Sequence, residues 1–122
     1  MKPIEIFKTV NDIKPSILEN SALLSFLNTV EAKLRKIVHN EKTYESIKYE
    51  DIETAELLLD EEHQEIYLYY LVSQVDYFTN DIDGYNNSIT LYNKALEDYT
   101  KENASRKKET PTYKYDYEGA FK

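Results

Sequence analysis

The feature that most constrains the fold is a run of apolar residues that keeps a heptad step from Leu68 to Tyr99. Its members lie three or four positions apart, so they fall on one side of an α-helix. Such a stripe must be covered by another helix, and it predicts a mainly α fold, a small antiparallel helical bundle. The stripe, called the seam below, consists of Leu68, Leu71, Val75, Phe78, Ile82, Tyr85, Ile89, Tyr92, Leu96 and Tyr99.

Residues 80–88 interrupt the seam chemically, because Asn, Asp, Gly and Ser are poor helix formers. Two arrangements are compatible with this interruption. Helices near 62–79 and 85–106 can form a hairpin about Gly84, or one long C-terminal helix can bend there. The unbroken step favours the bent helix slightly, since a loop would preserve the register only by coincidence. In either case the cationic run 106–108 suits a helix C-terminus.

The N-terminal half carries two further helical patterns. Apolar residues spaced by three and four predict a helix over 21–39, and a shorter pattern with Ile52, Ala55, Leu58 and Leu59 predicts one over 51–59. Residues 40–49 lose this periodicity and are expected to form a loop. Together these elements predict one helical domain over residues 1–108.

Two prolines limit the conformation of the first fifteen residues. Pro3 and Pro15 each restrict the residue before them, and Thr9 could cap a short helical piece over 10–14. Residues 1–15 are therefore expected to be an extended or turn segment that contains one such piece.

The last residues, 109–122, are predicted to form an extended or disordered arm. Pro111 stops helical structure, and Tyr113, Tyr115 and Tyr117 then alternate with polar residues, which places the three rings on one face of a strand. A strand without a partner in a helical domain could pair with a second chain by strand addition. The alternative is a frayed terminus.

Composition narrows the class of function. The chain of 122 residues has no Cys, which excludes disulfides and thiolate metal sites, and its net charge of −8 disfavours binding to phosphate backbones and anionic membranes. It shows no signal peptide and no apolar run long enough to span a bilayer, so no membrane association is expected. Twelve Tyr favour protein–protein contacts, although coding bias could also raise Tyr together with Lys, Asn and Ile.

No catalytic, cofactor or metal site is predicted. His39 and His63 lack a Cys partner and a regular spacing to paired carboxylates, and the acidic residues between 50 and 65 are scattered around helical faces. The sequence from Asp81 to Gly84 resembles the middle of a calcium loop, but Thr79 and Thr90 stand where that loop needs Asp and Glu. The chain is therefore expected not to be an enzyme and to need no cofactor.

The seam contains a repeat of tyrosines, which stand seven residues apart at 85, 92 and 99. They could belong to an ordinary core within one chain. Because buried hydroxyls need hydrogen-bond partners, a boundary between chains is the alternative. The predicted interface residues are Tyr85, Ile89, Tyr92, Leu96 and Tyr99 in the seam, with Tyr113, Tyr115 and Tyr117 in the arm.

A family resemblance rests on residues 61–108. The run Ile66-Tyr67-Leu68-Tyr69-Tyr70-Leu71, then Val75-Asp76, Tyr85-Asn86-Asn87 and Tyr92-Asn93, and a polar helix that reaches Arg106, resemble the head-to-tail connector proteins of tailed bacteriophages, also called head-completion or adaptor proteins. Gly84 departs from the pattern, because a helix former is expected there.

The resemblance implies a virion structural protein of the neck, assembled in the cytoplasm of the bacterial host. Such a protein joins a homo-oligomeric ring between the portal and the tail or adaptor proteins, a ring that could form only on the portal. Duplex DNA would pass through it without sequence-specific binding, and an acidic wall suits that passage. The seam tyrosines would contact neighbouring subunits and the arm an adjoining ring. A rival is a small cytosolic helical adaptor or inhibitor that binds one host protein.

Overall fold

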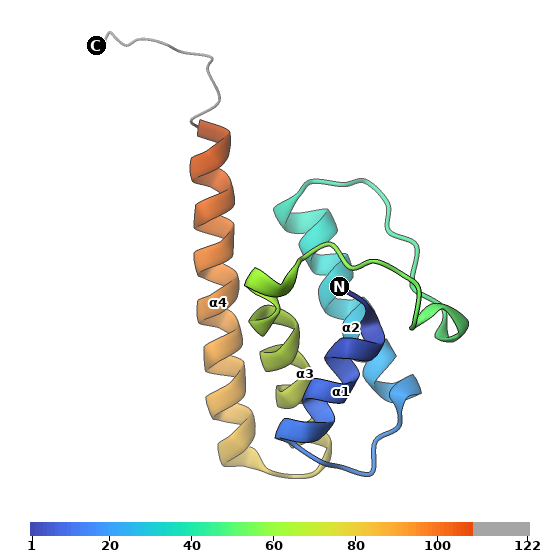
Figure 1. Cartoon of the computed structure of the whole chain (residues 1–122). Helices are drawn as coiled ribbons and strands as arrows, with labels where there is room; N and C mark the ends of the chain where they lie inside the picture. The colour runs from blue at the N-terminus through green and yellow to red at the C-terminus, as the bar shows by residue number, and fades with distance from the viewer. Residues whose placement is uncertain (109–122) are drawn as a thin grey trace, which may run out of the picture.

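Helices make up most of the chain in the computed structural model, which describes residues 1–108 (Figure 1). The antiparallel helical bundle predicted from the seam is confirmed, and the described residues contain no strand. The α-helices are α1 (Pro3–Ile13), α2 (Asn20–Lys33), α3 (Glu65–Phe78) and α4 (Ile82–Lys108), and short helical turns lie at Leu34–Val38, Tyr49–Asp51 and Glu61–His63.

The seam folds back on itself. α3 and α4 run antiparallel and pack along one another (Figure 1), so the two halves of the stripe face each other within one chain. The single bent helix that the register favoured is therefore wrong, and the hairpin is correct. The chain reverses over residues 79–81, which places Gly84 in the first turn of α4 and not at the reversal itself.

Two polar residues make this reversal. Asn80 adopts φ 64°, the left-handed conformation that commonly closes a helix, while the Asp81 N–H donates to the Asp76 carbonyl (2.9 Å). Asp81 then caps α4, because its Oδ1 accepts the Gly84 N–H (2.9 Å). A helix stop and a helix start thus stand side by side in the sequence, and this local chemistry overrides the continuous apolar step.

Residues 3–13 form a helix, so the expectation of an extended N-terminal segment is wrong. Pro3 stands in the first turn, where its missing N–H is harmless, and the Glu5 carboxylate accepts the Lys2 N–H (2.8 Å). Ile6, Phe7 and Val10 are completely buried on one face of α1. Burial of this apolar face stabilises α1, although the two prolines in this part of the sequence favour turns.

The helix predicted over 21–39 is confirmed as α2 followed by a π-helical turn over Leu34–Val38. Asn40, at φ 61°, ends this turn, and the Glu41 N–H returns to the Arg35 carbonyl (2.8 Å). The buried apolar side chains of α2 and the turn meet those of α1 and α3 in one core. From this part of the chain the core takes Leu23, Leu24, Leu27, Val30 and Leu34.

The helix predicted over 51–59 is absent. Residues 49–51 form one 3₁₀ turn, and the chain beyond it is irregular up to residue 60. Ile52, Leu57 and Leu59 are buried, so the segment over residues 41–60, which we call the strap, lies against the bundle. The backbone N–H groups of Leu57, Leu58 and Leu59 find partners on Met1, Glu31 and Tyr67, so they do not need the bonds of a helix.

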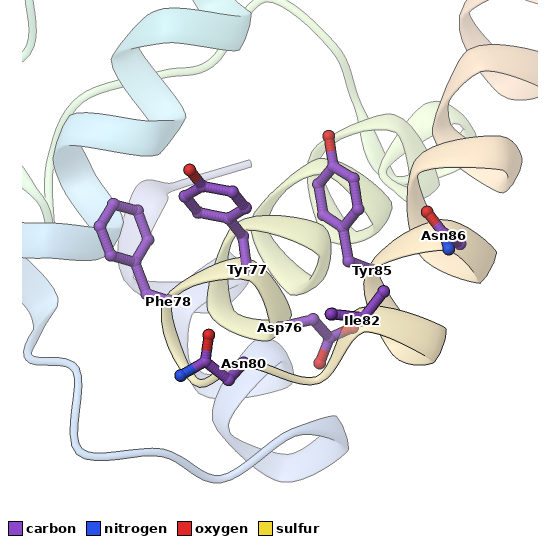
Figure 2. Close-up of a pocket in the computed structure, with 7 residues that line it drawn as sticks. All are labelled: Asp76, Tyr77, Phe78, Asn80, Ile82, Tyr85 and Asn86. Atoms are coloured by element: carbon purple, nitrogen blue, oxygen red, sulfur yellow. The ribbon is translucent and has the colours of Figure 1, made fainter.

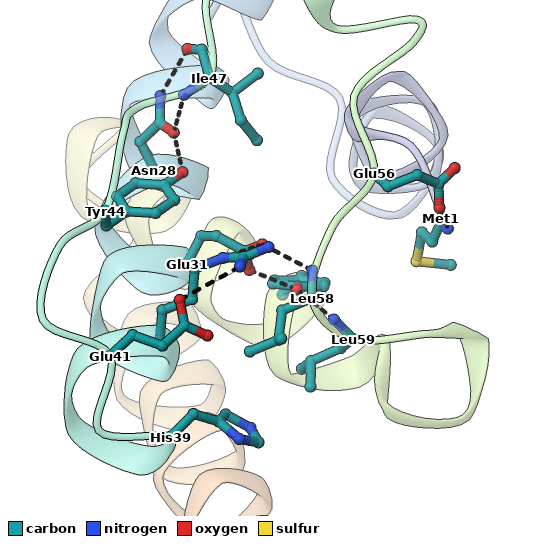
Figure 3. A network of polar contacts seen from close by, with 12 residues as sticks. Met1, Asn28, Glu31, His39, Glu41, Tyr44, Ile47, Glu56, Leu58 and Leu59 are labelled. Carbon is teal, nitrogen blue, oxygen red and sulfur yellow. Dashed lines mark hydrogen bonds and ion pairs between the residues drawn. The ribbon is translucent and has the colours of Figure 1, made fainter.

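Two side chains of α2 hold the strap in place (Figure 3). The amide of Asn28 accepts from the Ile47 N–H (2.9 Å) and donates to the Ile47 carbonyl (3.1 Å), as a neighbouring strand would. The same Asn28 oxygen accepts the Tyr44 hydroxyl (2.5 Å). An irregular backbone is thereby paired with a helix.

Glu31 is the second of these side chains, and only 1% of its surface is exposed. Its carboxylate accepts the Tyr67 hydroxyl (2.6 Å) and the Leu58 N–H (2.8 Å), and it pairs with the guanidinium of Arg35 (3.3 Å). The Tyr67 hydroxyl also accepts the Leu59 N–H (3.0 Å). One buried carboxylate therefore connects α2, α3 and the strap (Figure 3).

Within residues 1–108, none of the helices has the length and apolarity that a bilayer crossing requires. The arm predicted over 109–122 lies outside the described residues, and so do its three tyrosines.

Gly84 is required by crowding at the start of α4. A Cβ there would lie 2.5 Å from Oδ2 of Asp81 and 2.9 Å from Oδ2 of Asp76, and both carboxylates are held by other contacts. We expect Gly84→Ala to lower the free energy of unfolding by about 1–2 kcal/mol, although Ala favours a helix over Gly by about 1 kcal/mol.

Asn87→Ala, at an exposed position of the same helix, is the matched control. It should raise stability by a few tenths of a kcal/mol, because only helix propensity changes there. Urea unfolding followed by circular dichroism measures both variants. A gain in stability for Gly84→Ala would mean that the two carboxylates move freely.

Candidate functional site

An open groove lies where α3 ends and α4 begins (Figure 2). We call it the turn groove. Its volume is about 540 Å³, within the range of sites that take small ligands or single side chains of a partner. It is lined by Asp76, Tyr77, Phe78, Asn80, Ile82, Tyr85 and Asn86.

The walls of the turn groove are aromatic and exposed. Tyr77 is 62% exposed, Phe78 58% and Ile82 70%. Tyr77 contacts the rings of Phe78 (centroids 5.3 Å apart) and Tyr85 (5.8 Å), and Figure 2 shows the rings of Tyr77 and Tyr85 side by side, from different helices. Phe78 also stacks on Phe26 of α2 (5.5 Å). The rings therefore form a connected surface across three helices.

An ion cluster fixes the floor of the turn groove. Asp76 is buried and pairs with the Lys14 ammonium at the end of α1 (2.9 Å), which also pairs with Asp81 (2.6 Å). The Ser88 hydroxyl of α4 donates to Oδ2 of Asp76 (3.3 Å). Since Asp76 and Asp81 flank the reversal, this cluster ties α1 to both helices of the hairpin.

The structure places the predicted seam residues mostly inside the chain. Tyr92 is 3% exposed and lies against Tyr70 of α3 (5.1 Å), and Ile89 and Leu96 are half-buried against the same core. Burial raises the pKa of the Tyr92 hydroxyl to about 12. Tyr92 is therefore a core residue and presents no ring to a neighbouring chain.

Tyr85 and Tyr99 lie at opposite ends of the part of the seam that belongs to α4. Tyr85 is half-buried and lines the turn groove. Tyr99 shares a hydrogen bond with Nε2 of His39 (2.7 Å), and the ring of His63 packs edge-on against it (4.9 Å). The two histidines thus fasten α4 to the end of the π-helical turn and to the turn Glu61–His63, a contact that their separation in the sequence did not predict.

One group of side chains has the composition of a metal site. Asp60, Glu62 and His63 can bring ligand atoms within 4.8 Å of one another. The Asp60 carboxylate already accepts the Glu62 N–H (3.1 Å) as the cap of the turn Glu61–His63, and Asp60 and Glu62 are exposed. The capping arrangement accounts for this geometry.

Comparisons with models of protein families, with curated proteins and with solved structures find no match to this chain. Its surface chemistry is therefore the basis on which a function can be inferred.

Sequence reasoning missed the turn groove because it assigned Phe78 and Ile82 to the buried seam. The three-residue reversal removes both side chains from the interface between α3 and α4, so they face outward. Asn80 followed by Asp81 is the signal that could have located this reversal.

Two buried tyrosines allow a matched test of the packing. The Tyr67 hydroxyl joins Glu31 to the strap, whereas the Tyr92 hydroxyl has no hydrogen-bond partner among the described residues. We expect Tyr67→Phe to cost about 1–3 kcal/mol of unfolding free energy and Tyr92→Phe to cost nothing or to stabilise by up to about 1 kcal/mol. Chemical denaturation measures both. An equal cost for the two variants would show that the Tyr92 hydroxyl has a partner.

The Lys14 contact should appear in the titration of Asp81. Hydrogen bonding to Lys14 holds the pKa of the Asp81 carboxyl below its usual value of 3.8. The pair therefore stabilises the fold above that value, and its contribution is lost as the pH falls through the lowered pKa. In Lys14→Met, carbon-detected NMR should show the Asp81 pKa rising toward 3.8. An unchanged pKa would contradict the contact.

Proposed function

We propose that this chain is a structural, protein-binding subunit of the head-to-tail connector type, which forms a ring in the virion neck and joins the portal to the tail or adaptor proteins. It acts through contacts between proteins and uses no catalytic group or cofactor. The observation that carries the protein-binding part of the proposal is the exposed aromatic surface of the turn groove.

Apolar side chains that are this exposed to water cost free energy unless a partner protein covers them. Each of Tyr77, Phe78 and Ile82 leaves more than half of its surface in water, and the three lie next to one another. Contiguous apolar surface with a polar rim is typical of sites that bind proteins, and Tyr is among the residues that contribute most to such interfaces.

The turn groove is also preorganised. The ion cluster of Lys14, Asp76 and Asp81 anchors the reversal, and stacking on Phe26 restrains Phe78. Side chains that are already fixed lose little entropy on binding, so more of the contact free energy contributes to affinity.

The connector class is supported by the resemblance of residues 61–108 and by two properties of the chain. α4 has 27 residues, about 40 Å of helix, and extends well beyond α3 (Figure 1), as suits a subunit that bridges neighbours. The net charge of −8 would let a DNA polyanion pass a ring of such subunits without being held.

A pull-down tests the proposal. Tagged protein is incubated with lysate of the source, with and without residues 110–122, and bound proteins are identified by mass spectrometry. We expect portal or tail proteins to be recovered by the full chain and lost on truncation, because the arm is expected to supply part of the contact.

A matched pair of variants controls for loss of an exposed apolar side chain. Ile82→Ser changes the turn groove, and Ile37→Ser changes a residue of equal exposure elsewhere, 71% against 70%. Recovery should fall for the first variant only. Capture of one soluble host protein without any virion component would replace the connector by the regulatory adaptor.

A further inference from the structure

We infer that the turn groove of one copy binds the C-terminal segment of a second copy, residues 109–122, through the tyrosines at 113, 115 and 117. In the proposed ring, this contact is the interface between neighbouring subunits. The inference rests on the proposed function only in taking the assembly to close into a ring. The seam tyrosines were expected to make this interface, but Tyr92 lies in the core.

The segment and the turn groove match in chemistry. The groove offers the rings of Tyr77, Phe78 and Tyr85 as walls, and the exposed amides of Asn80 and Asn86 lie at its edge. Tyrosine side chains suit such a site, because the ring packs on aromatic surface while the hydroxyl needs a hydrogen-bond partner. In the segment, alternation with polar residues would present three such rings on one face of an extended chain.

Charge favours the same pairing. The start of α4 carries Asp81 and the exposed Asp83 beside buried Asp76, and Lys14 pairs with Asp76 and Asp81. The cationic run 106–108 precedes the segment, which itself carries Lys114 and Lys122 against Glu109, Asp116 and Glu118. Opposite charges therefore meet when the run 106–108 of one copy approaches the start of α4 of another.

The reach of the segment requires the contact to be between copies. About 35 Å of α4 separates Tyr85 from Lys108, where the segment begins. A fully extended chain carries Tyr113, Tyr115 and Tyr117 at most about 18, 25 and 32 Å beyond Lys108. The ring of Tyr117 can cover the remaining distance, but Tyr113 and Tyr115 fall short of the turn groove of their own chain. The three rings can therefore enter one groove together only in a second copy.

The contact joins two different surfaces, at opposite ends of α4. A heterologous contact of this kind leaves one groove and one segment free in every pair, so assembly continues into a ring if the rotation between subunits closes and into an open filament if it does not.

Photocrosslinking in the full-length protein tests the inference. Tyr115 is replaced by p-benzoylphenylalanine, and equal amounts of ¹⁴N- and ¹⁵N-labelled purified protein are mixed and irradiated at the highest concentration at which the chain stays in solution. We expect covalent dimers that contain one light and one heavy chain, with the crosslink in residues 76–86.

Two variants at exposed tyrosines test the specificity of the crosslink. Tyr77→Ser should lower the dimer yield about tenfold, the loss expected for a central aromatic contact. Tyr49→Ser, at 56% exposure against 62% for Tyr77, should leave the yield unchanged. Circular dichroism confirms that both variants are folded.

Three outcomes would overturn the inference: no covalent dimer, crosslinks confined to one chain or to another surface, or an equal yield in Tyr77→Ser. The assay contains only this protein, so its result is independent of the pull-down. Recovery of virion proteins together with crosslinks elsewhere would leave the connector intact and reject the segment as occupant of the turn groove.

Discussion

The fold depends on the buried carboxylate of Glu31. A charged group in a protein interior is tolerated only when hydrogen bonds and a counter-charge replace its water, and Tyr67, Leu58 and Arg35 supply them. Because these partners come from α3, the strap and α2 itself, satisfying one side chain fixes how three parts of the chain meet. Loss of any partner would leave a buried charge or a buried N–H uncompensated.

The same solution recurs at the other end of the bundle. Asp76 is buried at the end of α3, and Lys14 of α1 and Ser88 of α4 complete its contacts. The close approach of Asp76 and Asp81 to the first turn of α4 leaves space only for Gly84. These contacts tie both helices of the hairpin to α1, and the reversal brings the aromatic rings of α3 and α4 together at the surface.

The two ends of α4 therefore differ in character. The first turn combines carboxylates with an aromatic groove, whereas the sequence ends the helix with the cationic run 106–108, ahead of the tyrosines at 113, 115 and 117. Residues whose apolar surface is already covered by the chain's own core, such as Tyr92, contribute stability and not recognition.

Sequence alone determined the helical class, the helix over 21–39 and the helical character of the C-terminal half, because these follow from the spacing of apolar residues. It left open whether that half is a hairpin or one bent helix. It did not decide whether Phe78 and Ile82 are buried, since both continue the heptad step of Leu71 and Val75. Nor could it show that residues 51–59 do not form a helix, because the groups that accept from the N–H donors of Leu57 and Leu58 lie far away in the sequence. Only the tertiary structure decided these points. The spacing of apolar residues shows which side chains share one face of a helix. Which element packs against that face depends on contacts between residues that are distant in the sequence.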